Sequence, residues 1–200
     1  MNKINQVFSN RGDRKLLSLY FCAGTPTLEG TGEVIKTMER RGIDFVEVGI
    51  PFSDPLADGP VIQTAATKAL RNGMSLKTLF AQLSAIKDEV SIPLILMGYL
   101  NPILHYGIEA FCQSCAEAGI SGMIIPDLPF DDYLNTVKPT ADKYDLRVIM
   151  LITPRPRRSA SASSTRTPTA SSTWFRRPPS PVPRSRSTSR SRHTSSASMP

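Results

Sequence analysis

The chain has 200 residues, of which 40% are hydrophobic and 20% charged, a composition typical of a soluble globular protein. Its formal net charge of +7 arises near its end: residues 155–200 hold ten arginines and no acidic residue, whereas residues 1–154 carry 14 basic and 17 acidic side chains, a net charge of −3. The first 154 residues therefore show no basic excess that would suit a nucleic acid, and no segment approaches the ~20 apolar residues that span a bilayer.

Short apolar runs alternate along the chain with segments of helical period, which is typical of repeated strand–helix units and a parallel sheet. We expect five strands, at residues 16–22, 45–50, 93–98, 122–126 and 146–152. We expect five helices, at residues 28–41, 61–71, 75–90, 108–118 and 131–144. Units of this kind build either a doubly wound sheet or a (β/α)8 barrel, and a full barrel needs about 250 residues.

The most informative segment is the end of the second strand with the loop that follows, EVGIPFSDPLADGP at residues 47–60. Glu47 interrupts an apolar strand, where an ionisable group is unfavourable unless it has a partner or a chemical role. Asp58 lies on the next loop, on the face where (β/α)8 proteins build active sites. One interpretation is an acid/base pair of carboxylates. The other is that Glu47 forms a structural ion pair across the barrel floor while Asp54 and Asp58 help to form turns, and these residues alone leave both open.

The same segment closely resembles the signature of tryptophan synthase alpha subunits. The resemblance continues in order through LYFCAGTP (19–26), ILMGYLNPILHYGIEAF (95–111) and GMIIPDLPF (122–130), and covers nearly all of residues 1–153. It implies an α/β fold, a (β/α)8 TIM barrel of the ribulose-phosphate-binding type, of which residues 1–153 would supply about five βα units.

The resemblance also implies a reaction. The family cleaves indole-3-glycerol phosphate to indole and glyceraldehyde 3-phosphate in tryptophan biosynthesis, an aldol cleavage that needs no cofactor and no metal. Position by position, Glu47 matches the acid/base that serves indole C3 and the side-chain hydroxyl, and Asp58 matches the carboxylate that holds the indole N–H. Substrate-binding residues are expected at the strand ends, where each could equally be ordinary barrel core: Tyr20, Tyr99, Leu100 and Leu128.

A protein partner is implied in the same way. In this family the loop that carries Asp58 and the segment around Asn101 and Pro102 face a beta subunit, in an alpha2–beta2 tetramer. The beta subunit uses pyridoxal phosphate, and the alpha chain holds none. No nucleic acid and no membrane are expected as partners.

Two other features are interpreted as structural. Cys112 and Cys115 lie inside a predicted helix without a second pair or a nearby histidine for zinc, which favours helix packing. His105 stands alone in the loop expected after the third strand. The three cysteines, an odd number, indicate a reducing compartment rather than a secreted disulfide framework, and we expect a cytoplasmic protein.

The resemblance stops after Thr153 and Pro154, and residues 154–200 are rich in Arg, Ser and Pro. If residues 170–175 (ASSTWF) are read one base earlier, the bases can encode Gly-Phe-Ile-Tyr-Met-Val, a suitable sixth strand for this family. Residues 181–184 (PVPR) can likewise encode Thr-Gly-Ala-Gln, a turn that the family places after that strand. We therefore expect that residues 154–200 are out of frame and disordered, and that the chain as written is inactive. The chain with its reading frame restored after residue 153 is called the frame-restored chain below.

Two alternatives remain. Residues 154–200 could be a disordered Arg/Ser-rich segment that binds nucleic acid on a degenerate barrel, although Trp174 and Phe175 are its only aromatic pair and it contains no folded reader module. The chain could also belong to another phosphate-binding barrel enzyme, since an acid at the end of the second strand is not unique to one family. The Asp58-Gly-Pro context favours the family named above.

Overall fold

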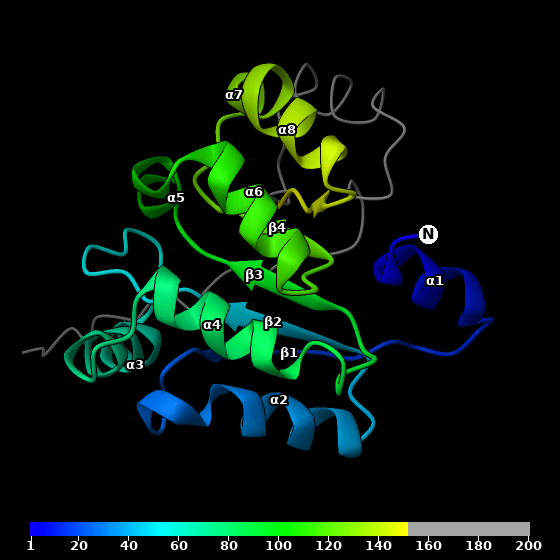
Figure 1. Cartoon of the computed structure of the whole chain (residues 1–200), viewed down its shortest axis with the longest axis horizontal. Helices are drawn as coiled ribbons and strands as arrows, with labels where there is room; N and C mark the ends of the chain where they lie inside the picture. Colours follow the sequence, from blue (N-terminus) through cyan, green and yellow to red (C-terminus); the bar gives the residue numbers. More distant parts are fainter. Residues whose placement is uncertain (152–200) are drawn as a thin grey trace, which may run out of the picture.

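A computed structural model describes residues 1–151 of the chain, and the predicted tail at residues 154–200 lies outside them. Its centre is one parallel sheet of five strands (Figure 1). The strands are β1 (Ser18–Cys22), β2 (Phe45–Gly49), β3 (Leu94–Met97), β4 (Gly122–Ile124) and β5 (Arg147–Val148). They are adjacent in chain order, without the reversal that defines a doubly wound sheet, and this is the winding of a (β/α)8 barrel.

All five predicted strands are present, and the fifth is shorter than the seven residues expected. The predicted helices are also present, as α2 (Thr31–Arg40), α3 (Pro60–Arg71), α4 (Leu76–Ile86), α6 (Ile108–Glu117) and a final segment in three parts. That segment consists of α7 (Phe130–Asp132), the π-helical turn η2 (Tyr133–Val137) and α8 (Lys138–Lys143). A short 3-10 turn, η1 (Leu28–Gly30), precedes α2. Among residues 1–151 no helix is long and apolar enough to cross a membrane.

Two helices were not predicted. Helix α5 (Leu100–Tyr106) follows β3 directly, so the prediction that His105 lies in a loop was wrong. Its first backbone N–H, that of Leu100, donates to Asp127 Oδ1 at 2.9 Å. A carboxylate at the start of a helix satisfies a free N–H and favours the positive end of the helix dipole. The cap comes from the loop after the next strand, and the sequence near residue 100 does not contain it.

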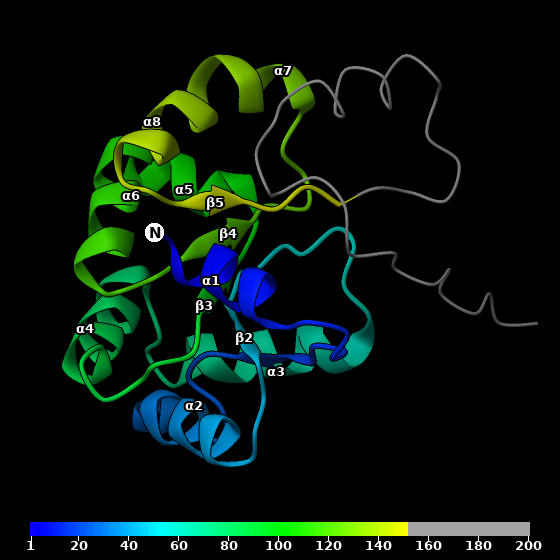
Figure 2. The same ribbon diagram turned by 90° about the vertical axis from the view of Figure 1, so that its right-hand side faces the viewer.

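The other unpredicted helix is α1 (Lys3–Asn10), which covers the side of the sheet opposite α4 and α6 (Figure 2). Asn2 caps this helix, because its Oδ1 accepts from the backbone N–H of Ile4 at 2.9 Å. The Asn2 amide also donates to the carbonyl oxygens of Ser121, at 2.8 Å, and Asp145, at 2.5 Å. These bonds tie the chain start to the N-terminal ends of β4 and β5.

The sheet separates two apolar cores, because successive strand residues point to opposite faces. The outer core lies between the sheet and the helices and includes Val46, Val48, Leu94, Leu96 and Met123. Cys112 and Cys115 are buried in this core as free thiols, as predicted. The smaller inner core consists of Ile4 from α1 with Phe45, Ile95 and Ile124. The inner face of the sheet is the face that would line a barrel.

Candidate active site

Glu47 is the middle residue of β2 and faces the inner side of the sheet. Its neighbours Val46 and Val48 are buried in the outer core, so alternation along the strand directs Glu47 the other way. The side chain is half-buried, and its Oε1 accepts a hydrogen bond from Ser18 Oγ at 2.6 Å. Among residues 1–151, Glu47 takes part in none of the ion pairs, so the alternative of a structural ion pair finds no partner there.

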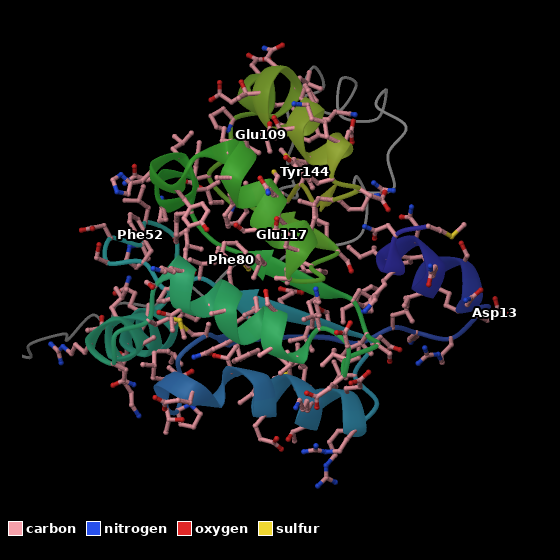
Figure 3. The ribbon with its side chains drawn as sticks, viewed as in Figure 1. Asp13, Phe52, Phe80, Glu109, Glu117 and Tyr144 are labelled. Carbon is pink, nitrogen blue, oxygen red and sulfur yellow. The ribbon has the colours of Figure 1, made fainter. Side chains whose placement is uncertain are left out.

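Asp58 lies on the loop between β2 and α3 and is held by Tyr99. The Tyr99 hydroxyl donates to Asp58 Oδ2 at 3.1 Å and accepts from the Ala57 N–H at 3.0 Å. Tyr99 is itself buried beside the ring of Phe52, with 5.5 Å between the ring centroids. Figure 3 shows Phe52 at the carboxyl end of the sheet, the end opposite Asp13. The loop that carries Asp58 is thus attached to the start of α5 at the carboxyl ends of the strands.

Tyr20 lies near enough to both carboxylates for their charges to affect its hydroxyl. It pairs with Glu47 in the β1–β2 register, and its ring leans over Gly49, where an added Cβ would lie only 2.2 Å from the Tyr20 hydroxyl oxygen. Only glycine at position 49 leaves room for this ring. Burial raises the pKa of Tyr20 well above its usual value, and nearby Cys22, Asp58, Tyr99 and Glu47 raise it further. The Tyr20 hydroxyl therefore stays protonated and is available as a hydrogen-bond donor.

The structure brings Tyr20 and Tyr99 close to the two acids, but Leu100 and Leu128 lie differently. Leu128 is buried in the outer core and Leu100 packs against it, so neither belongs to the inner-face rows that contain Glu47. Their predicted contacts with a substrate remain predictions.

Three residues of the inner face were missed. Met97 pairs with Gly49 and Ile124 pairs with Met97, which places both in the row just beyond Glu47 toward the carboxyl ends. Ser18 was missed as well, although it hydrogen-bonds to Glu47. Alternation along the third and fourth predicted strands contains the signal for Met97 and Ile124, once a shared register with β2 is assumed. No sequence pattern marks Ser18.

This arrangement can move protons. Two carboxylates, one on a strand and one on the following loop, stand near two tyrosine hydroxyls, with apolar side chains of β3 and β4 in the next row. Among residues 1–151, no group of three or more His, Cys, Asp or Glu side chains is arranged to hold a metal ion. Carboxylates and hydroxyls in a partly buried site are suited to general acid/base catalysis.

Comparison with known proteins identifies the family. The sequence model described as "Tryptophan synthase alpha chain" matches residues 8–167, which is most of the chain. The chain belongs to the tryptophan synthase alpha chain family. The match extends beyond residue 153, where the resemblance was expected to stop, although residues 152–167 lie outside the described part.

Relatives in the family are similar at the level of sequence. The tryptophan synthase alpha chains of Phocaeicola vulgatus and Bacteroides fragilis are 62% and 64% identical over 154 residues, which is 77% of this chain. The chain spans only 59% and 58% of the length of these two relatives.

Solved structures agree with the family. The alpha subunit of Legionella pneumophila superposes with a TM-score of 0.74 at 37% identity, covering 80% of this chain and 62% of that one. A tryptophan synthase structure from M. tuberculosis, in an aminoacrylate-bound form, gives a TM-score of 0.76 at 31% identity, covering 82% of this chain and 66% of that one. The expected barrel winding is therefore confirmed for the described strands.

Proposed function

We propose that this chain carries the acid/base residues of a lyase that cleaves indole-3-glycerol phosphate to indole and glyceraldehyde 3-phosphate in tryptophan biosynthesis. The observation that carries the proposal is that Glu47 lies on the inner face of β2 and Asp58 on the loop that follows the same strand, both within the segment that matches the family. The chain spans about three fifths of its relatives, so the activity is proposed for residues 1–153 together with an in-frame continuation.

Glu47 would carry the proton through the reaction. The protonated carboxyl gives a proton to indole C3, which makes the ring a cationic leaving group. The resulting carboxylate then takes the proton of the side-chain hydroxyl, a carbonyl forms, and the carbon–carbon bond breaks. The electron pair of that bond returns to the ring and restores neutral indole. One group can serve both steps because the proton it gives up is replaced by the one it receives.

Asp58 would stabilise the positive charge that forms on the ring nitrogen, by accepting a hydrogen bond from the indole N–H. A carboxylate placed beside developing positive charge stabilises the transition state more than the neutral substrate. Tyr99 supports this role, because its hydroxyl bonds to both Asp58 and the loop backbone and so limits how far the carboxylate can move. Tyr20 and Met97, which are both partly exposed, offer apolar surface for the indole ring.

The partner in this proposal is a tryptophan synthase beta subunit, in an alpha2–beta2 assembly whose beta subunit holds the pyridoxal phosphate. The loop that carries Asp58 supports it, because Leu56 and Val61 on either side are 89% and 80% exposed. These two exposed side chains on either side of Asp58 offer apolar area for contact with another protein. Cytoplasmic location belongs to the same proposal and is supported by the three free thiols.

The proposal is tested on the frame-restored chain, mixed with a beta subunit and supplied with indole-3-glycerol phosphate. Glu47→Gln keeps the size of the side chain but removes the proton carrier, so we expect indole release to be lost while circular dichroism is unchanged. If the variant retains turnover within about tenfold of the parent, Glu47 does not have the proposed role.

A further inference from the structure

We propose that Ser18 is a positioning residue for Glu47: its hydroxyl fixes one oxygen of the Glu47 carboxylate and so sets the direction of the other for proton transfer. This inference rests on the lyase function proposed above. It extends that function to a residue on a different strand that would not itself touch the substrate.

The register of β1 and β2 determines the side from which Ser18 contacts the Glu47 carboxylate. Tyr20 pairs with Glu47 and Ser18 pairs with Phe45, so Ser18 lies one inner-face row nearer the N-terminal ends of the strands. From there its Oγ donates to Glu47 Oε1 at 2.6 Å. Ser18 therefore contacts the carboxylate from the N-terminal side of the strands, the side away from the loop of Asp58.

Glu47 needs such a contact because little else restrains its side chain. A glutamate has three rotatable side-chain bonds, and a carboxylate without partners samples several rotamers. In the part of the chain that the structure describes, Ser18 is the side chain that donates to Glu47, and the six ion pairs involve other acids. A proton carrier must lie within hydrogen-bond reach of each atom that it serves. A bond to Oε1 restricts the plane of the carboxylate and thereby the place of Oε2.

The strands do not depend on this bond for their pairing. β1 and β2 are joined by a parallel backbone ladder from Ser18 and Phe45 to Cys22 and Gly49, and this ladder is independent of the Ser18 hydroxyl. Loss of the hydroxyl at position 18 should therefore leave the sheet intact. The effect of the hydroxyl on the orientation of Glu47 can then be measured apart from any effect on the pairing of β1 and β2.

Ser18→Thr and Ser18→Val form a matched pair for the test. Both side chains are β-branched, fit a strand and have nearly the same volume, but only threonine retains the donor. In the frame-restored chain with a beta subunit, we expect Ser18→Val to lower kcat about tenfold with little change in KM, because a small misplacement of an acid/base group slows the chemical step. Ser18→Thr should restore kcat.

A second measurement uses the full 200-residue chain and does not depend on activity. With glutamate labelled by carbon-13 at the side-chain carboxyl, the Glu47 resonance is assigned by its disappearance in Glu47→Gln. We expect this resonance to move in Ser18→Val and to stay in place in Ser18→Thr. An unmoved resonance in both variants would overturn the hydrogen bond itself.

The variants also separate this inference from the function on which it rests. If Glu47→Gln is inactive and Ser18→Val has the kcat of the parent, the lyase proposal stands and the role of Ser18 is wrong. If both substitutions at position 18 lower kcat equally, the added volume is responsible and the positioning role is again wrong. If Glu47→Gln retains full turnover, both proposals fail.

Discussion

Within residues 1–151, one side chain, Tyr99, hydrogen-bonds to the carboxylate of Asp58. Tyr99 Oη lies 3.1 Å from Asp58 Oδ2 and also accepts from the Ala57 N–H. An amide at position 58 could keep the bond to Tyr99, because its oxygen accepts as the carboxylate does, but it could not offset positive charge on the ring nitrogen.

We therefore expect Asp58→Asn in the frame-restored chain to lose most of its activity, by about a hundredfold in kcat/KM, while its melting temperature is nearly unchanged. Asp88→Asn is the control, since Asp88 is an exposed carboxylate just after the C-terminal end of α4, away from the loop of Asp58. Steady-state indole release measures both. Unchanged kinetics in Asp58→Asn would place Asp58 among residues that only form the turn.

At this scale the sequence draws attention to the charged candidate residues and passes over the neutral ones. Glu47 stands out because it interrupts an apolar strand, and Asp58 stands out through its loop motif. Met97, Ile124 and Ser18 are ordinary strand residues, and only the register of neighbouring strands brings them to the site. A register results from the packing of the whole sheet, which no local pattern reveals.

Among the elements, the short helix α1 packs against three strands of the sheet through one buried side chain. Its Ile4 is buried with Phe45, Ile95 and Ile124, and an added Cβ at Gly122 would lie 2.8 Å from the Ile4 side chain. The helix therefore packs closely on the inner face at the N-terminal ends of the strands. The apolar residues Ile4, Val7 and Phe8 recur at helical spacing, so the sequence did contain a signal for α1, within a segment too short for periodicity alone to decide.

We expect Asn2→Ala to lower the free energy of unfolding by about 1–3 kcal/mol, because it removes the helix cap and leaves the buried carbonyl of Ser121 and the partly buried carbonyl of Asp145 without this donor. Asn10→Ala, at the exposed last residue of the same helix, should change it by less than about 0.5 kcal/mol. Urea unfolding of the 200-residue chain compares the two. Equal effects would mean that Asn2 does not anchor α1.

Helix α6 carries Cys112, whose buried thiol makes the stability of the outer core depend on pH. Burial, and secondarily the charge of Glu109, raises the pKa of Cys112 from 9.0 to about 11. The folded state thus favours the neutral thiol, whereas the unfolded chain ionises above pH 9. The stability that Cys112 contributes is fully present below pH 9.0 and is lost as the pH rises toward about 11.

The free energy of unfolding should therefore fall less steeply between pH 9 and pH 11 in Cys112→Ala than in the parent, because one of the buried thiols no longer titrates. Urea unfolding at several pH values measures the two slopes, and the tyrosines and lysines that also titrate there are common to both proteins. Identical slopes would show that the Cys112 thiol is accessible to water in the folded state.

For the whole molecule, the order of the strands is the decisive feature. Five parallel strands in chain order curve toward a barrel, and within residues 1–151 the sheet ends at β1 on one side and at β5 on the other. The alternation of strands and helices predicted a parallel sheet but left a doubly wound sheet and a barrel both open, and it was the family resemblance that predicted the barrel. The sequence could not determine the length of β5, which depends on its neighbours. Unpaired strand edges favour aggregation, and a substrate bound at the carboxyl ends would need contacts from further strands of the barrel.

The most direct test of this account compares indole release by the 200-residue chain and by the frame-restored chain, each with a beta subunit and indole-3-glycerol phosphate. Both proteins contain Glu47, Asp58 and the five described strands, and they differ only after residue 153. We predict release of indole by the frame-restored chain, its loss in the Glu47→Gln variant of that chain, and no detectable release by the 200-residue chain. Comparable activity of the two chains, or activity that survives Glu47→Gln, would contradict the account.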